Sequence, residues 1–316
     1  MSQDAEPIGP SETSRLPAPR PPLSPNRPRV HSAPMERPEI IESPDRLSAL
    51  AGGIFVPTMG ALHEGHLSLI RLARSIGGPV ITSIFVNPTQ FGPGEDFDRY
   101  PRTMDADVEL ATEAGTDVIY APSAATVYPD GVEHAASVPL PAVATDPGLE
   151  DAGRPHFFTG VCDVVGRLFD QVRPGVAIFG EKDWQQFQVI RAMVANDPRF
   201  SNIEVRPGPI VRDPDGVAMS SRNAYIPDDA RPRARGLVTA LEAIRDCHDA
   251  EDAESSMKSV LEAHALDVEY AVIRDAETLC PPSTPDRPRR AIITARLDFE
   301  GGSVRLLDNG PFPLAR

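Results

Sequence analysis

Two histidines stand close together where a short apolar segment gives way to a helical pattern. The segment reads Pro57-Thr-Met-Gly-Ala-Leu-His-Glu-Gly-His66, with His63 and His66 on either side of Gly65. The first turn of a helix has free backbone N–H groups and a dipole that favours an anion, by roughly 0.3–1 kcal/mol for an exposed charge. Imidazoles there can donate hydrogen bonds to phosphate oxygens, and Gly65 permits close approach of a nucleotide. The motif predicts a nucleotide-phosphate site; a pair of surface histidines on an ordinary helix is the alternative.

Neutral polar side chains form a second motif, Phe85-Val-Asn-Pro-Thr-Gln-Phe91. Asn87 and Gln90 can both donate and accept hydrogen bonds, which suits a small substrate bearing hydroxyls and a carboxylate. Tyr100-Pro-Arg-Thr103 follows at a distance that suits an adjoining wall of the same pocket. Taken alone, the motif also fits an ordinary loop at the end of a strand.

A third motif, Phe179-Gly-Glu-Lys-Asp-Trp-Gln-Gln186, carries charge directly after an apolar segment. Gly180 allows a sharp turn, and Lys182 offers a point charge for phosphate. Asp183 can accept from ribose hydroxyls, and Gln186 adds a neutral polar contact. A solvated charged turn is the alternative interpretation.

The fourth motif is Gly216-Val-Ala-Met-Ser-Ser-Arg-Asn223. Its two hydroxyls, Ser220 and Ser221, precede Arg222 and make a compact phosphate clamp, with charge-assisted hydrogen bonds worth roughly 1.5–3 kcal/mol each. A capped loop before a helix would use the same residues. The motif predicts a phosphate contact far along the chain from the histidines.

The elements that hold these motifs alternate in type. Apolar strands are expected at 53–57, 80–86, 117–120, 176–179 and 203–205, and helices after Thr58 up to Gly77, at 105–114, 160–172 and 184–194. Strands that are apolar throughout, alternating with amphipathic helices, indicate a Rossmann-like doubly wound parallel sheet, an α/β fold covered on both faces. Ligands bind beyond the carboxyl ends of such strands, where the first three motifs fall.

The pattern changes after about Pro209, to a long helix at 228–247, a second helix, and strands at 268–273, 291–297 and 303–307. We therefore expect a Rossmann-like domain over 39–208 and a smaller α+β domain over 209–316. Residues 1–38 hold ten prolines and almost no large apolar side chains, so we expect a disordered tail. A Pro-rich ligand for a partner is the alternative, and Met35 is a second possible start.

Composition excludes several classes of function. A net charge of −15 argues against nucleic acid as a partner, because nucleic-acid binding needs a basic face. No apolar run approaches the ~20 residues of a membrane span, and no signal-peptide core is present, so we expect a cytoplasmic protein without a membrane partner. Cys162, Cys247 and Cys280 form no zinc or Cys-x-x-Cys spacing, which favours reduced thiols.

In this order and spacing, the four motifs resemble the pantoate–β-alanine ligase (pantothenate synthetase) family of the His-x-Gly-His nucleotidylyl-transferase superfamily. The resemblance runs from about residue 40 to 312 and includes Val268–Asp275, Thr278-Leu279 and Val304–Asn309 near the end. It implies that AMP is transferred from MgATP to the pantoate carboxylate, with release of pyrophosphate. The amine of β-alanine then attacks the acyl-adenylate and expels AMP.

The resemblance also implies roles for residues. His66 would be the proton donor and contact phosphate with His63, while Lys182 would stabilise charge on pyrophosphate; these are the expected catalytic residues. Gln90 and Gln186, helped by Asn87, would bind pantoate on the side shared with β-alanine. The expected ATP contacts are Met59, Gly60, His63, His66, Gly180, Lys182, Asp183, Val211, Met219, Ser220, Ser221 and Arg222. Mg²⁺ would sit on the phosphates with few or no protein ligands.

Two larger features follow from the resemblance. The 209–316 domain is expected to close as a lid and exclude water from the acyl-adenylate. A homodimer is also expected. One segment departs from the family pattern Arg-Pro-Gly-His-Phe-Arg-Gly-Val: here it reads Arg154-Pro-His-Phe-Phe-Thr-Gly-Val161, with His156, Phe157 and Thr159 as the changed residues.

Two other functions remain open at this point. One is an adenylyltransferase of the same superfamily that acts on a mononucleotide or a phosphopantetheine-like acceptor. The other is a catalytically dead, nucleotide-binding relative, for which the altered segment 154–161 is the only support. Pantoate-dependent turnover separates these from the ligase, since all of them would bind ATP.

Overall fold

The computed structural model of the chain describes residues 37–92, 94–134, 138–284 and 286–313. The tail expected to be disordered, 1–38, lies outside these residues except for its last two positions. All the described residues belong to one compact unit, so the domain boundary placed between 208 and 209 stays a prediction. Among the described residues, no helix combines the length and apolar character needed to cross a membrane.

A six-stranded parallel sheet forms the N-terminal part, in the order β1-β4-β3-β2-β5-β6. Its strands are β1 (Glu39–Ile41), β2 (Ile54–Thr58), β3 (Val80–Ile84), β4 (Val118–Tyr120), β5 (Val176–Gly180) and β6 (Glu204–Gly208). The chain runs outward from β2 through β3 to β4 and then returns to place β5 against the other side of β2. Strand order therefore reverses between β2 and β5, and a doubly wound sheet binds ligands at such a point.

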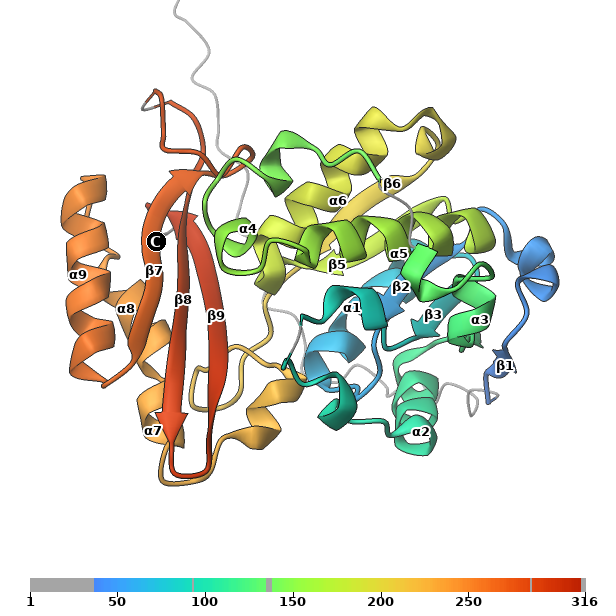
Figure 1. The fold of residues 1–316 in the computed structure, drawn as a ribbon, viewed down its shortest axis with the longest axis horizontal. Helices are drawn as coiled ribbons and strands as arrows, with labels where there is room; N and C mark the ends of the chain where they lie inside the picture. Colours follow the sequence, from blue (N-terminus) through green and yellow to red (C-terminus); the bar gives the residue numbers. More distant parts are fainter. Residues whose placement is uncertain (1–36, 93, 135–137, 285, 314–316) are drawn as a thin grey trace, which may run out of the picture. The chain divides into compact units, whose positions relative to one another are not determined.

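Helices cover both faces of this sheet (Figure 1). Helices α1 (Glu64–Ile76) and α2 (Met104–Ala114) share one core with Val56, whereas α5 (Phe157–Val172) and α6 (Trp184–Asn196) share another with Phe55. Neighbouring residues of β2 face opposite layers because side chains alternate along a strand. The remaining short helices of this part are α3 (Ala124–Val127) and α4 (Glu150–Gly153).

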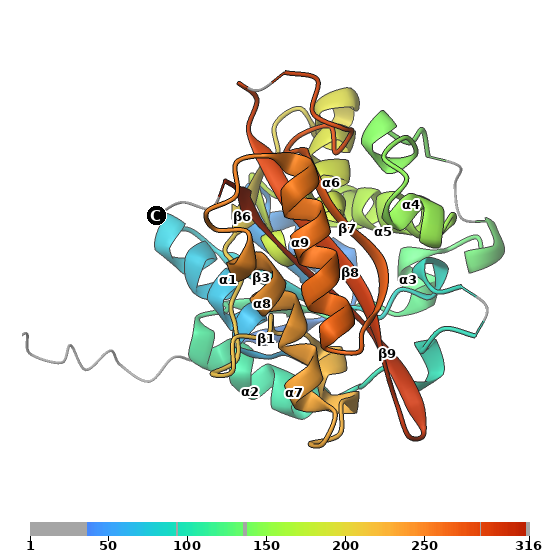
Figure 2. The same cartoon turned by 90° about the vertical axis from the view of Figure 1, so that its left-hand side faces the viewer.

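The C-terminal part contains a three-stranded antiparallel sheet in the order β7-β8-β9. These strands are β7 (Asp267–Asp275), β8 (Arg289–Phe299) and β9 (Gly302–Phe312), and the preceding helices are α7 (Arg231–Ala234), α8 (Gly236–Ala243) and α9 (Ala250–Ala263). Figures 1 and 2 show α8 and α9 along one face of this sheet. Leu241, Leu261 and Ile293 belong to the core between them. We call β7–β9 the C-terminal sheet.

The fold class is confirmed, and most of the expected strands and helices lie within a few residues of the observed ones. The single long helix expected at 228–247 is wrong. Its residues form α7 and α8, separated at Arg235, and α8 ends at Ala243. Gly236 packs so closely that an added Cβ would lie 2.8 Å from His264 Cβ, and glycine is a poor residue for a helix interior. The sequence prediction also missed the three-residue strand β1.

Candidate functional site

The first motif forms the loop between β2 and α1, with His63 as the N-cap of α1. The Nδ1 atom of His63 accepts a hydrogen bond from the Gly65 N–H at 3.1 Å, and the Nδ1 atom of His66 accepts from the His63 N–H at 3.4 Å. The two ring centroids are 4.1 Å apart. Because each Nδ1 is an acceptor, each neutral ring carries its proton on Nε2. The loop thus provides two imidazole N–H donors for a ligand.

Both histidines are neutral at physiological pH. Burial lowers the pKa of His63 to about 4, with a smaller effect of the positive charge on Lys182. Burial lowers the pKa of His66 to about 3, followed by the effects of His63 and Lys182. These histidines therefore offer hydrogen bonds, while Lys182 supplies positive charge to the same place.

Asp107, a residue that the sequence analysis missed, holds the loop from α2. Its carboxylate is 1% exposed and accepts hydrogen bonds from the Ala61 N–H at 3.0 Å and the Leu62 N–H at 2.7 Å. Gly60 turns the chain just before them with a φ of +80°. An aspartate on the apolar face of a predicted helix was the available signal, because a buried carboxylate needs specific donors.

The second motif meets the first through Gln90 and Met59. The Nε2 atom of Gln90 donates to the Met59 Sδ at 2.9 Å, and its Oε1 accepts from the Asn87 Nδ2 at 3.3 Å. Asn87 is 1% exposed; it also donates to the Gly160 carbonyl at 3.2 Å and accepts from the Tyr128 hydroxyl at 2.7 Å. The buried Asn87 therefore orients the Gln90 side chain. Of the two residues, Gln90 is the one that contacts the first motif and borders the site.

The third motif follows β5, so its turn lies beside the histidine loop after β2. Gly180 ends the strand, Lys182 and Asp183 form a short 3-10 turn, and Gln186 lies in the first turn of α6. The Lys182 Nζ is 3.6 Å from the Asp183 Oδ1, with the Lys182 side chain 18% exposed and that of Asp183 47% exposed. Adjacent strands that end at one edge of the sheet thus bring the lysine and the histidines together.

The fourth motif reaches this edge from the C-terminal part. The Ser221 hydroxyl donates to the Ala61 carbonyl at 3.2 Å, and Ser220 accepts from the Arg222 N–H at 3.3 Å. Met219 lies over Gly65, where an added Cβ would be 3.7 Å from the Met219 Cβ, and its N–H donates to the Val211 carbonyl at 3.0 Å. All four motifs therefore converge on one region of the structure.

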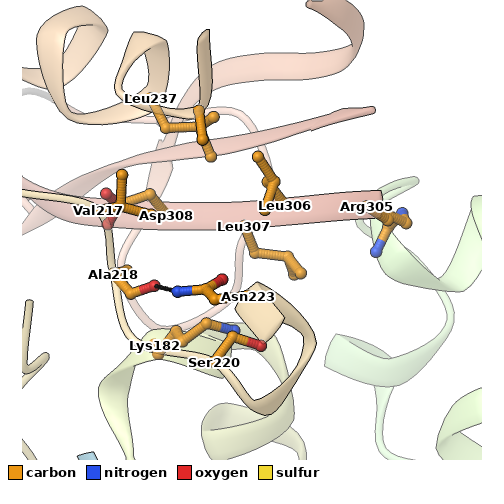
Figure 3. A pocket seen from close by; sticks show the side chains of 11 residues that line it. Lys182, Val217, Ala218, Ser220, Asn223, Leu237, Arg305, Leu306, Leu307 and Asp308 are labelled. Carbon is orange, nitrogen blue, oxygen red and sulfur yellow. Dashed lines mark hydrogen bonds between the residues drawn. The ribbon is translucent and has the colours of Figure 1, made fainter. Parts of the chain in front are cut away.

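Lys182 and Ser220 line one pocket between the third motif and the C-terminal sheet (Figure 3). The cavity has a volume of about 10 Å³, roughly the room for one water molecule. The other lining residues include Val217, Asn223, Leu237 and Asp308. We call residues 219–222 the clamp and the turn Glu181–Asp183 the lysine turn. In this conformation the clamp lies against the lysine turn.

Arg222 is already paired, a contact that the sequence analysis did not foresee. Its guanidinium donates to both carboxylate oxygens of Asp96, at 2.8 and 2.9 Å, and lies 5.6 Å from the centre of the Tyr100 ring. Burial acts to raise the pKa of Asp96, but the hydrogen bonds and charge of Arg222 outweigh it, and the pKa is lowered. A phosphate group that used Arg222 would compete with this carboxylate.

The segment that departs from the family pattern lies beside the loop that carries Asp96. Arg154 donates to the Glu95 carboxylate, with a Nε–Oε1 distance of 2.9 Å, and to the Gln90 carbonyl at 3.1 Å. Its guanidinium carbon is 3.9 Å from the centre of the Phe157 ring, and His156 is exposed. Phe157 thus provides a face on which Arg154 stacks while it holds the loop.

The described residues contain no group of three or more His, Cys, Asp and Glu side chains placed to hold a metal ion.

Comparison with known proteins gives one consistent result. A family model described as pantoate-beta-alanine ligase matches residues 41–311. Pantothenate synthetase from Nitrobacter winogradskyi is 45% identical over 278 residues, which cover 86% of this chain and 95% of that protein. Pantothenate synthetase from Thermus thermophilus is similar in structure, with a TM-score of 0.78, 40% identity, and coverage of 86% of this chain and 98% of that one.

A second solved structure is that of a pantoate-beta-alanine ligase from Francisella tularensis complexed with beta-gamma ATP and beta-alanine. It matches with a TM-score of 0.69 and 29% identity, and the match covers 87% of this chain and 97% of that one. The likeness therefore extends over nearly the whole of each relative.

Proposed function

The chain belongs to the pantoate-β-alanine ligase family, and we propose that it joins pantoate to β-alanine at the expense of ATP, through a pantoyl-adenylate. One observation supports the site assignment above all others. The histidine loop after β2 and the lysine turn after β5 lie at the strand-order reversal of the sheet, and the serine–arginine clamp docks on the histidine loop through Ser221.

In the first step, a carboxylate oxygen of pantoate attacks the α-phosphorus of ATP. The bond from that phosphorus to the bridging oxygen breaks, and pyrophosphate leaves with the negative charge. Lys182 and Arg222 would stabilise this charge, together with the hydroxyls of Ser220 and Ser221. The Nε2–H groups of His63 and His66 would donate to phosphate oxygens, and His66, the expected proton donor, would act through this N–H as a neutral ring. Their low pKa values support hydrogen-bond donation by neutral rings.

In the second step, the neutral amine of β-alanine attacks the acyl carbon of the adenylate. The bond to AMP breaks, an amide forms, and the nitrogen loses a proton. Gln90 and Gln186 would hold pantoate through both steps, and Asn87 would act through Gln90. The nucleoside would lie against Met59, Gly60, Gly180, Asp183, Val211 and Met219.

Three further assignments belong to the proposal. Mg²⁺ would neutralise the triphosphate while bound chiefly to phosphate oxygens. The part after residue 208 would act as a lid, because the clamp segment is anchored there by the Arg212–Asp308 ion pair, with an N–O distance of 2.6 Å. The protein would be a cytoplasmic homodimer; its free, widely spaced cysteines are in keeping with a reducing compartment.

The test is pyrophosphate release from MgATP in the presence and absence of pantoate, followed by pantothenate formation when β-alanine is added. We expect release to require pantoate and product to require all three substrates. Lys182→Ala should reduce the release by at least about 100-fold and leave the circular dichroism spectrum unchanged. Wild-type protein that binds ATP without pantoate-dependent release would rule out the proposed reaction.

A further inference from the structure

We propose that Asn309, assisted by Arg290, positions Lys182 for adenylation from the C-terminal sheet. This inference rests on the proposed function, since it takes Lys182 as the group that stabilises the departing pyrophosphate. Asn309 lies on β9 and Arg290 on β8, more than 100 positions along the chain from Lys182. Neither residue is among those expected to contact a substrate, and both act through the backbone and neighbours of the lysine turn.

The Asn309 side chain donates hydrogen bonds to two consecutive backbone carbonyls of the lysine turn. Its Nδ2 donates to the Glu181 carbonyl at 3.0 Å and to the Lys182 carbonyl at 2.8 Å. The side chain belongs to a residue that is only 3% exposed, so water cannot readily replace these hydrogen bonds. The amide therefore fixes the peptide units on both sides of the Lys182 Cα, from which its long side chain projects.

Arg290 adds contacts to Asn309 and to residues on either side of Lys182. Its Nε donates to the Asn309 Oδ1 at 2.5 Å, which directs the amide nitrogen of Asn309 toward the turn. Its Nη2 donates to the Glu181 Oε2 at 2.9 Å. Its guanidinium carbon lies 3.6 Å from the centre of the Trp184 ring, and the Trp184 Nε1 donates to the Ala276 carbonyl at 2.8 Å. The C-terminal sheet and its flanking turn thus contact Glu181, Lys182 and Trp184 at once.

The Arg290–Glu181 ion pair also neutralises a negative charge next to the lysine in the sequence. Glu181 directly precedes Lys182, and its carboxylate lies 2.9 Å from the Arg290 Nη2. Without that partner, Glu181 would be free to compete with phosphate for the Lys182 ammonium group. Asn309 holds the backbone of Lys182 in position, and Arg290 neutralises the carboxylate of Glu181. Both effects make the Lys182 ammonium group available to pyrophosphate, which forms only in the first half-reaction.

Asn309→Asp is the most selective variant. It keeps the size of the side chain and an oxygen for Arg290, but it replaces the two N–H donors with a carboxylate oxygen that faces two carbonyls. We expect pantoate-dependent pyrophosphate release to fall by about 100-fold, the scale of loss for a misplaced catalytic group. Aminolysis of synthetic pantoyl-adenylate by β-alanine should stay within about threefold of wild type, since pyrophosphate has already left.

Arg290→Met is a second variant that disturbs the same contacts with the lysine turn. It should lower the same half-reaction, and it should change the fluorescence of Trp184, the one tryptophan in the sequence, because the guanidinium leaves the ring. Tyr270→Phe is the matched control. It removes another part-buried hydrogen bond between the two parts of the chain, from the Tyr270 hydroxyl to the Glu150 Oε1 at 2.5 Å, without touching the lysine turn.

The outcomes separate the possible roles. Loss of the first half-reaction alone in Asn309→Asp and Arg290→Met, with Tyr270→Phe close to wild type, would support the proposal. Equal losses in both half-reactions, or an equal loss in Tyr270→Phe, would show a general role in docking and overturn it. Unchanged pyrophosphate release in Asn309→Asp would overturn it as well. Failure of wild-type protein to release pyrophosphate would instead reject the proposed function, and this inference with it.

Discussion

Among the single residues of the site, neutral histidines offer hydrogen bonds, whereas a lysine and an arginine supply the positive charge. His63 and His66 use Nδ1 to accept backbone N–H groups, and burial keeps their rings neutral. Lys182 and Arg222 carry the positive charge, one from each part of the chain. This division suits a reaction in which a triphosphate must be bound firmly and pyrophosphate must still leave, because neutral donors attract the anion less strongly than cations do.

The neutral histidines should make stability depend on pH. Above about pH 6.5 both rings are neutral in the folded and unfolded chain, and they cause no difference. Between that pH and about 4, the unfolded chain binds protons that the folded chain does not, so the free energy of unfolding falls as the pH falls. Each histidine should cost at most about 2 kcal/mol of stability at pH 5.

The measurement compares thermal unfolding at pH 7 and pH 5 for wild type and for the double variant His63→Asn, His66→Asn. Asparagine keeps an acceptor near the Nδ1 position but does not titrate. We expect the fall in Tm between the two pH values to be smaller in the variant. An equal fall in both proteins would contradict the lowered pKa values.

Among the elements, the clamp is anchored on the C-terminal part of the chain and also bonds to the N-terminal part. Arg231 binds Asp213 and Asp215 behind the loop, with N–O distances of 2.6 and 2.7 Å. The contacts of the clamp with the N-terminal part include the Ser221–Ala61 hydrogen bond and the Arg222–Asp96 ion pair. The ion pair therefore holds the clamp in a position that ATP binding would have to change.

Asp96→Asn should lower the KM for ATP. The variant removes the carboxylate that competes with phosphate for Arg222, and a partly exposed pair of this kind is worth about 1 kcal/mol, or about fivefold in KM. Steady-state pyrophosphate release at saturating pantoate measures the effect. Glu95→Gln is the matched control, because it breaks the neighbouring pair with Arg154 on the same loop and leaves Arg222 paired. A raised KM in Asp96→Asn would mean that Asp96 orients Arg222 for phosphate instead.

At the scale of the whole molecule, a buried polar network joins the C-terminal sheet to α4. Arg305 donates to both oxygens of Glu150, at 2.6 and 2.7 Å, and to Glu269 at 2.8 Å. The Glu150 side chain is 8% exposed, and it also accepts from the Tyr270 hydroxyl. Burial raises the pKa of that hydroxyl, with a further contribution from the negative charge of Glu150. The network fixes where the C-terminal sheet meets the rest of the chain.

Arg305→Met should destabilise the protein by about 3–5 kcal/mol, because it leaves the buried carboxylate of Glu150 without its positive partner. Urea unfolding followed by Trp184 fluorescence measures the change. Adding Glu150→Gln to this variant removes the unpaired charge and should restore much of the loss. A single variant that unfolds within about 1 kcal/mol of wild type would show that the network contributes little.

The amino-acid sequence was enough to predict the site residues and to place most of the strands and helices on which they lie. Apolar strands that alternate with amphipathic helices have few stable arrangements other than a covered parallel sheet, so periodicity alone assigns His63 and Lys182 to the carboxyl ends of strands in one sheet. That these two strands, β2 and β5, are neighbours is known only from the structure. Helix boundaries that depend on close packing could not be assigned in this way. The break at Arg235 is one; the next residue, Gly236, packs against His264, far along the chain.

The partners of the predicted site residues could be identified only in the folded structure. Asp107 beneath the histidine loop, Asp96 on Arg222, and Asn309 on the lysine turn are all distant in sequence from the residues they hold. Their identity follows from how buried polar groups find donors and acceptors once the layers have packed, and local sequence periodicity contains no record of that pairing.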